Sequence, residues 1–502
     1  MNLLSILVFS PLLGILVLLC MPKTKEYWLK GIGLFATLPA LVLSLSAFFQ
    51  YRSGASLTKW DEQLNWISFK NPIQYGDLFS IQYELGVDGL SLLMIVLTAI
   101  IATLASIASI QIKQEWKGYF ILFLLLEIGM LGVFAAENLI LFFLFFELTL
   151  VSTFFLIGKW GYLEREKAAY SFLIYNGLGS AILLIVIIVL FARTGTSNIE
   201  ALQAIMTSDH PDLVSGISEQ LKYGLFIALF IAFGIKLPTF PLHRWMVRVH
   251  VEAPPAIVML HSGILLKIGA YGLIRFGLGI FPEPFQDFAP FLAFLGVINL
   301  LYGAYLALNQ KDFKMVLAYS SISHMGIVLM GLGSLNEAGI QGAMFQVVSH
   351  GLISALFFFL VGVLYERTAT TKIPELGGMA KVMPVTSGFF LVAAMAMLGL
   401  PGMSGFISEF MAFLGLFEEM PVLAAVGTMG IIMTAVYILT KVLGITYGKA
   451  KPEWTGVSDL RKVEYIPALV LTGLIVLIGV YPQVLGEPLQ ATIDLMMLRI
   501  GG

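Results

Sequence analysis

Long apolar segments separated by short polar loops follow one another along almost the whole chain. Each segment is close to the roughly 20 residues that a helix needs to cross a bilayer. Fourteen such segments can be counted, at 3 to 21, 31 to 50, 85 to 110, 117 to 135, 138 to 158, 168 to 192, 224 to 246, 255 to 280, 289 to 309, 315 to 335, 339 to 365, 386 to 417, 422 to 447 and 465 to 482. The pattern predicts an all-α polytopic membrane protein with about fourteen transmembrane helices.

Lysine and arginine are distributed unevenly between the loops. Of the 29 Lys and Arg residues, 19 lie in every second loop beginning with the first, six lie on the other side, and four fall inside spans. Because loops on the inner side of a membrane carry the excess of positive charge, this asymmetry predicts that both termini lie outside. The longest polar insertion, 51 to 84, then falls on the outer side, where we expect a small hairpin or lid.

Composition agrees with this class and excludes others. The 502 residues are 58% hydrophobic and 12% charged, with a mean hydropathy of +0.91, whereas soluble domains are about 25% charged. The net charge of -2 gives no indication of nucleic-acid binding. Cys20 is the single cysteine, which excludes a disulfide framework and a self-contained iron–sulfur site. We expect no metal site in this chain, and a retained first helix rather than a signal peptide.

Six ionisable side chains fall near the middle of predicted spans, where long side chains cannot reach the headgroups. They are Glu147, Lys236, Lys267, His324, His350 and Glu409. Each buried charge costs roughly 2.5–3.5 kcal/mol on insertion scales, so a set of six favours function over packing. Buried lysine changes its proton affinity readily and histidine titrates near neutral pH, which suits proton movement. A buried Glu–Lys pair that only fixes helix packing is the structural alternative.

Prolines and glycines interrupt two of these spans close to the buried charges. They are Pro238 and Pro241 in the seventh span, and Pro401, Gly402 and Gly405 in the twelfth. Unwound backbone at that depth is tolerated where it is enclosed by protein or lines a water-filled cavity. Ordinary proline kinks are the alternative.

The two interruptions are five spans apart, which predicts two inverted five-helix repeats, helices 4 to 8 and 9 to 13. The predicted division is residues 1–116 for the N-terminal helices, 117–282 and 283–450 for the repeats, and 451–502 for the last helix and tail.

Several stretches resemble the antiporter-like subunits of respiratory complex I. They are FFELTLVSTFFLIGKWG around Glu147, FGIKLPTFPLHRWMVRVHVEAPPAIVMLHSGILLKIGAYGLIRF across Lys236 and Lys267, LAYSSISHMG around His324, SHGLISALFFFLVGVLYER around His350 and LGLPGMSGFISEF around Glu409. The sibling L and N subunits and the related antiporter subunit typically carry lysine at the position of Glu409. Glutamate there, and the absence of a long lateral helix after the last span, point to the M type.

The resemblance implies a role for each buried group. Glu147 and Lys236 are the expected gating pair, Lys267 the connecting lysine, His324 and His350 the relay groups, and Glu409 the group nearest the outer exit. It also implies L and N subunits as partners, flavin (FMN), iron–sulfur clusters and quinone held by partner subunits, and a bacterial plasma membrane.

Two other functions remain open. One is a subunit of a multi-subunit Na⁺/H⁺ antiporter without a redox partner. The other is a chain whose buried charges only hold an assembly together.

Overall fold

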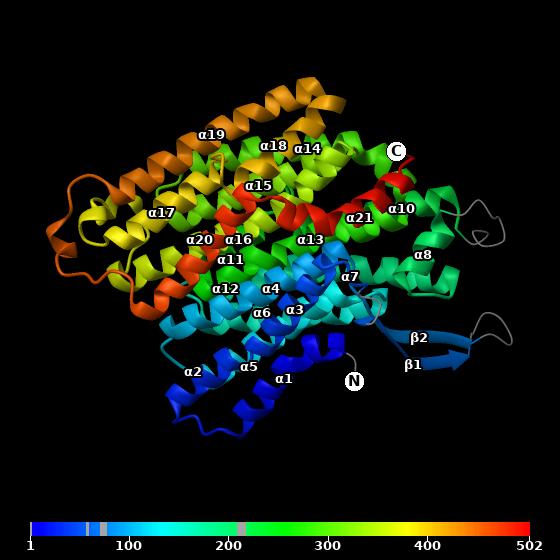
Figure 1. The fold of residues 1–502 in the computed structure, drawn as a ribbon, viewed down its shortest axis with the longest axis horizontal. Coiled ribbons are helices and arrows are strands. Elements are labelled where there is room, and N and C mark those ends of the chain that lie inside the picture. Colours follow the sequence, from blue (N-terminus) through cyan, green and yellow to red (C-terminus); the bar gives the residue numbers. More distant parts are fainter. Residues whose placement is uncertain (1–2, 57–59, 71–77, 208–216, 502) are drawn as a thin grey trace.

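The computed structural model describes residues 3–56, 60–70, 78–207 and 217–501. It is mainly helical, and within the described residues twelve helical segments are long and apolar enough to cross a membrane. Figure 1 shows one elongated bundle, with α1 (Leu3–Cys20) along one edge and α19 (Pro421–Thr446) along the opposite edge. The prediction of an all-α polytopic membrane protein is confirmed.

The first half of the bundle precedes residue 282. Its other helices are α2 (Glu26–Phe35), α3 (Leu38–Arg52), α4 (Gly89–Ala108), α5 (Trp116–Ala135), α6 (Leu139–Trp160), α7 (Arg165–Thr194), α8 (Ile199–Met206), α10 (Glu219–Lys236), α11 (Arg244–Glu252), α12 (Pro255–Leu260) and α13 (Leu266–Gly272). Two π-helical turns, His261–Leu265 and Leu273–Leu278, join α12 and α13 into one span and extend it. The apolar pattern did not predict these turns.

The second half contains the remaining helices. They are α14 (Pro282–Asn309), α15 (Phe313–Gly333), α16 (Glu337–Thr368), α17 (Pro384–Met397), α18 (Ser404–Glu419), α20 (Tyr465–Val480) and α21 (Gln483–Arg499). The predicted spans 224 to 246 and 386 to 417 correspond to α10 with α11 and to α17 with α18. Fourteen spans are reached only if each of these pairs counts as one, so that number stays a prediction, as do the inverted repeats and the division of the chain at residues 116, 282 and 450.

Two strands form a hairpin in the long polar insertion. β1 (Glu62–Lys70) pairs antiparallel with β2 (Leu78–Leu85), so that Glu62 lies opposite Leu85. The buried carboxylate of Glu62 accepts hydrogen bonds from the backbone N–H (3.0 Å) and the hydroxyl (2.5 Å) of Ser5, which attach the hairpin to α1. The expected hairpin is confirmed, although residues 57–59 and 71–77 of the insertion lie outside the described residues. Figure 1 places the hairpin and both chain ends at the same end of the bundle.

The spans differ in how much of their surface the protein covers. All residues in the most apolar windows of α16 and of the span Pro255–Leu278 are buried, and α4 and α15 are nearly as enclosed. In contrast, α7 and α19 expose apolar side chains such as Ile174, Ile185 and Ile432. Exposed aliphatic faces of this kind suit contact with lipid chains. The enclosed helices are the ones that carry Lys267, His324 and His350.

Glycines allow α14 and α15 to pack closely against each other. A methyl group at Gly296 would lie 2.6 Å from the carbonyl oxygen of Gly326, and one at Gly303 would lie 2.6 Å from the backbone nitrogen of Ser323. Small residues at such positions let two backbones approach within a membrane. This contact fixes the position of α15, which carries His324.

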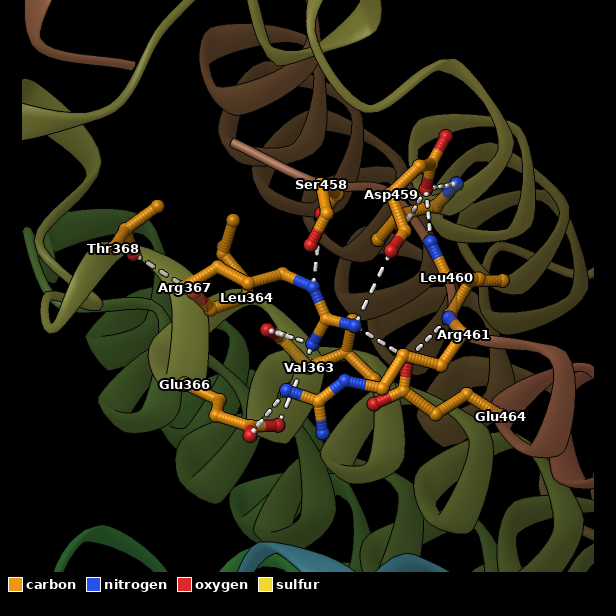
Figure 2. A network of polar contacts seen from close by, with 11 residues as sticks. Val363, Leu364, Glu366, Arg367, Thr368, Ser458, Asp459, Leu460, Arg461 and Glu464 are labelled. Atoms are coloured by element: carbon orange, nitrogen blue, oxygen red, sulfur yellow. Dashed lines mark hydrogen bonds and ion pairs between the residues drawn. The ribbon is translucent and has the colours of Figure 1, made fainter. Parts of the chain in front are cut away.

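Arg367 near the end of α16 holds the segment that leads into α20 (Figure 2). Its guanidinium donates to the carbonyl oxygens of Ser458 (2.9 Å) and Asp459 (3.2 Å) and pairs with the carboxylate of Glu464 at 2.5 Å. Arg367 and Glu464 are both nearly buried on their side chains, at 5% and 2% exposure. This network therefore fastens the C-terminal helices to the enclosed core.

Candidate functional site

Two broken helices border the buried charges, as the prolines and glycines predicted. α10 ends at Lys236 and α11 begins at Arg244, so Pro238 and Pro241 lie in the first break. α17 ends at Met397 and α18 begins at Ser404, so Pro401 and Gly402 lie in the second.

The prediction for Gly405 was wrong, because this residue lies in the first turn of α18. A methyl group there would come within 2.1 Å of the carbonyl oxygen of Ala396. Glycine is needed at this position for close approach of the two half-helices rather than for the break itself.

Polar side chains compensate the unwound backbone of the first break. The side-chain oxygen of Asn299 on α14 accepts a hydrogen bond from the backbone N–H of Phe240 at 2.7 Å, and its amide donates to the carbonyl oxygen of Pro238 at 3.4 Å. Thr239 donates its hydroxyl to the carbonyl oxygen of Gly234 at 3.0 Å. Because these groups satisfy the backbone within the protein, the break is stable at membrane depth.

Lys236 lies at the end of α10 with only 1% of its surface exposed. Its ammonium nitrogen lies 4.9 Å from the ring centre of Phe146 and 5.5 Å from that of Phe172. No hydrogen-bond partner for this nitrogen, or for Oε1 of Glu147, is found among the described residues. The two predicted gating groups are therefore not in direct contact, and aromatic faces rather than a carboxylate surround the lysine.

Four of the predicted residues lie in one row in the centre of the bundle. The ammonium nitrogen of Lys267 lies 2.6 Å from Nδ1 of His350. The ring centres of His350 and His324 are 5.5 Å apart, and Nδ1 of His324 lies 3.4 Å from Oε1 of Glu409. All four are buried, with at most 7% exposure. The structure thus links the last span of the first half to α15, α16 and α18.

A second set of polar groups holds this chain in place. The side-chain amide of Gln346 lies 3.1 Å from Nδ1 of His324, and its oxygen accepts a hydrogen bond from the hydroxyl of Ser408 at 2.5 Å. His324, Gln346, His350 and Glu409 line a small cavity together with Gly405. Its free space of about 10 Å³ is close to that needed for one water molecule. A single water there could complete the path between the two histidines and Glu409.

The sequence analysis missed a second pair of buried histidines. Nε2 of His250 on α11 lies 3.0 Å from Nδ1 of His261 in the π-helical turn. Both residues have 0% exposure, and among the described residues the outer nitrogens, Nδ1 of His250 and Nε2 of His261, have no partner. The pair lies between the two lysines in sequence, after Lys236 and before Lys267. His250 fell outside the predicted spans, so a count of depth along the sequence could not find it.

Arg275 and Asp88 form an ion pair where α4 begins. Burial alone would raise the pKa of Asp88, but the guanidinium of Arg275 and hydrogen bonds from Ser91 outweigh it and lower this pKa below its usual value. Asp88 also caps α4, since its carboxylate accepts from the backbone N–H of Ser91 at 2.9 Å. Arg275 therefore has an ion-pair partner inside the protein, although it lies near the end of its predicted span.

Metal ligands do not gather at this site. Within residues 3–56, 60–70, 78–207 and 217–501, no group of three or more His, Cys, Asp or Glu side chains could hold a metal ion. What the arrangement offers chemically is a row of groups that can each take up and release a proton. The row crosses from the first half of the chain to the second.

Comparison with known proteins now identifies the family. The family model of the NADH:quinone oxidoreductase/Mrp antiporter transmembrane subunits matches residues 136–434. This chain belongs to that family. The matched region includes all six predicted site residues and both broken helices.

Individual relatives cover nearly the whole chain. It is 34% identical to NADH-ubiquinone oxidoreductase chain 4 of Marchantia polymorpha, covering 98% of this chain and 96% of the relative. It is 35% identical to NADH-quinone oxidoreductase subunit M of Rhodobacter capsulatus, covering 97% and 94%. Among solved structures, a chain of respiratory complex I from Thermus thermophilus superposes with a TM-score of 0.85 at 29% identity, covering 99% and 100%. The predicted resemblance to antiporter-like subunits is confirmed.

Proposed function

We propose that this chain is the M-type, or chain 4, subunit of an NADH-quinone oxidoreductase and that it moves protons across the membrane. The observation that carries this proposal is the buried chain of Lys267, His350, His324 and Glu409. Its relatives carry the names subunit M and chain 4. The glutamate at position 409, where the L and N siblings typically have lysine, supports the M type.

Protons pass along the row by exchange between neighbouring groups. A proton on Lys267 moves to Nδ1 of His350, 2.6 Å away, and leaves a neutral amine that can accept the next proton. The carboxylate of Glu409 then accepts the proton from Nδ1 of the second histidine, His324, which lies 3.4 Å from Oε1. Lys236 and Glu147 control loading from the first half, because a change in their separation changes how strongly the lysine holds its proton.

Energy for outward transport comes from partner subunits in this proposal. Moving one charge costs roughly 2.3 kcal/mol per 100 mV of membrane potential, and the sequence carries neither G-x-G-x-x-G nor a P-loop motif. Flavin, iron–sulfur clusters and quinone would reside in those partners, which include the L and N subunits. The membrane is that of a bacterium, with both termini on its outer side, as the distribution of Lys and Arg favours.

Two changes test the proton path directly. Replacing Lys236 or Glu147 by alanine should leave the complex assembled, with its flavin content unchanged, and sharply reduce proton translocation and coupled quinone reduction. Lys236→Arg should not restore transport, since a guanidinium keeps its proton. An assembled Lys236→Ala complex that translocates protons at the wild-type rate would refute the assigned role.

A subunit of a multi-subunit Na⁺/H⁺ antiporter is the second candidate, because the matching family also includes Mrp antiporters. Tagging the chain, extracting it in mild detergent and testing for copurified flavin, iron–sulfur absorbance and NADH-driven quinone reduction separates the two. Sodium/proton exchange by an intact complex without redox centres would favour this second candidate.

A further inference from the structure

Another buried charged side chain lies outside the central row. Lys314, at the start of α15, is only 4% exposed, yet no carboxylate within 4 Å pairs with it among the described residues. Among the described residues, its ammonium nitrogen donates one hydrogen bond, to the backbone carbonyl oxygen of Val251 at 3.2 Å. A buried ammonium without a carboxylate is unusual and calls for another means of stabilisation.

Two tyrosine rings supply this stabilisation. The ammonium nitrogen lies 3.8 Å from the ring centre of Tyr162 and 4.9 Å from that of Tyr365. The two rings also contact each other edge to face, with centres 4.8 Å apart. Ring faces attract a cation without providing a fixed negative charge. When this lysine releases its proton, no unpaired carboxylate remains in the site.

The nearest acidic side chains are already occupied by other groups. Asp312 caps α15 by accepting from the backbone N–H of Lys314 at 2.9 Å and also accepts the hydroxyl of Thr371 at 2.6 Å. Glu252 accepts the backbone N–H of Glu164 at 2.9 Å. Both carboxylates contribute favourable charge at a distance, but neither holds the ammonium in place.

Two cavities are lined by residues that contact Lys314 or adjoin it along the chain. One of about 520 Å³ is lined by both tyrosines together with Lys113, Arg165 and Glu366. The other, of about 180 Å³, is lined by Val251, whose carbonyl oxygen accepts from Lys314, and by the following residue, Glu252. Met315, which follows Lys314 in α15, also lines this cavity. Both belong to the end of the bundle that the charge distribution assigns to the inner side. Their size admits several water molecules.

α11 leads from the carbonyl partner of Lys314 to a buried histidine, without a direct contact between the two side chains among the described residues. Val251, whose carbonyl accepts from the lysine, directly follows His250. His250 in turn contacts His261 at 3.0 Å. His250 therefore lies between the lysine at the cavities and the region of Lys236 and Lys267.

We propose that Lys314, held between Tyr162 and Tyr365, is the inner entrance group of the proton path. This inference rests on the proposed proton-translocating function. The neutral amine takes a proton from water in the inner cavities, becomes an ammonium held by the ring faces, and passes the proton to the His250–His261 pair. It is then neutral again and ready for the next proton.

Two substitutions at this position test the alternation between charged and neutral states. Lys314→Arg keeps a permanent charge and the ring contacts, and Lys314→Gln is permanently neutral. Both should assemble with wild-type flavin content and lose about a hundredfold in proton translocation per NADH, the low end of what removing a proton-transfer group costs. Lys311→Arg is the matched control, because Lys311 is exposed three residues away, and it should translocate protons normally.

Each other outcome overturns the inference. Normal transport by Lys314→Arg would make the lysine a structural cation, and normal transport by Lys314→Gln would make it a space-filling side chain. Failure of both variants to assemble, while Lys311→Arg assembles, would likewise assign it a structural role. Lys236→Ala is measured in parallel: if it loses transport while the Lys314 variants do not, only the entrance is wrong. If assembled Lys236→Ala also transports normally, the proposed function itself fails.

Discussion

Replacing Glu409 by glutamine is the sharpest perturbation of the central row. Glutamine has nearly the same shape and can still be enclosed among His324, Gln346 and Ser408, but it carries no charge and takes up no proton. Nδ1 of His324 lies 3.4 Å from the carboxylate. When that histidine is protonated, two unit charges at this separation attract by about 5 kcal/mol at an effective dielectric constant of about 20.

Even a third of this attraction changes a proton equilibrium by about tenfold, since 1.4 kcal/mol corresponds to a factor of ten. We therefore expect Glu409→Gln to lower proton translocation by about tenfold or more while the complex assembles. Glu409→Asp keeps a titratable carboxylate that is one methylene shorter, and should retain an intermediate rate.

The assay is proton uptake into proteoliposomes that contain the purified complex, followed with a pH-sensitive dye after addition of NADH and quinone. Flavin content per complex reports assembly. Glu419→Gln is the matched control because Glu419 is an exposed carboxylate on the same helix, α18. A fully assembled Glu409→Gln complex with wild-type proton translocation would refute the reasoning that Glu409 receives the proton from His324.

Three further predictions concern stability. Gly405→Ala should reduce the yield of assembled complex, because the added methyl would meet the carbonyl oxygen of Ala396 at 2.1 Å; unchanged yield would show that α17 and α18 can separate. Burial raises the pKa of Glu137, in the loop between α5 and α6, to about 7, so its contribution to stability is present below about pH 4.5 and is lost as the pH rises through about 7. The unfolding temperature of wild-type complex should then fall relative to Glu137→Gln over that range, by an amount corresponding to about 3 kcal/mol, and parallel curves would contradict this. Arg367→Ala should expose the linker before α20 to protease, since it leaves the nearly buried carboxylate of Glu464 without its ion-pair partner and with only the backbone N–H of Arg461 donating to it; an unchanged cleavage pattern would argue against the anchor.

The sequence predicted the parts of this molecule that depend on local pattern. Apolar length predicted the spans, and prolines beside buried charge predicted both broken helices. Depth along a span singled out Lys267, His324, His350 and Glu409, and the structure brings these four together because helices of equal length packed side by side bring equal depths together. The roles assigned to these residues stay predictions.

What the sequence could not supply depends on tertiary packing. His250 and Lys314 occur at or beyond the ends of predicted spans, where a polar residue is ordinary. They become buried because α11, after the break at Pro238 and Pro241, packs on α7 and α15. Because of the break, the short helix α11 packs inside the bundle and its polar side chains become buried. Hydropathy along the sequence does not detect this burial. His261 was missed for a different reason, since it lies only a few residues inside its span.

The same packing places contacts of two buried lysines across the boundary between the two halves of the chain. Lys267 belongs to the predicted first repeat, whereas its hydrogen-bond partner His350 belongs to the second. Lys314 also belongs to the second repeat, yet its carbonyl partner Val251 and one of its rings, Tyr162, belong to the first. A shift of one repeat against the other would therefore change both contacts at once, one in the central row and one at the inner cavities.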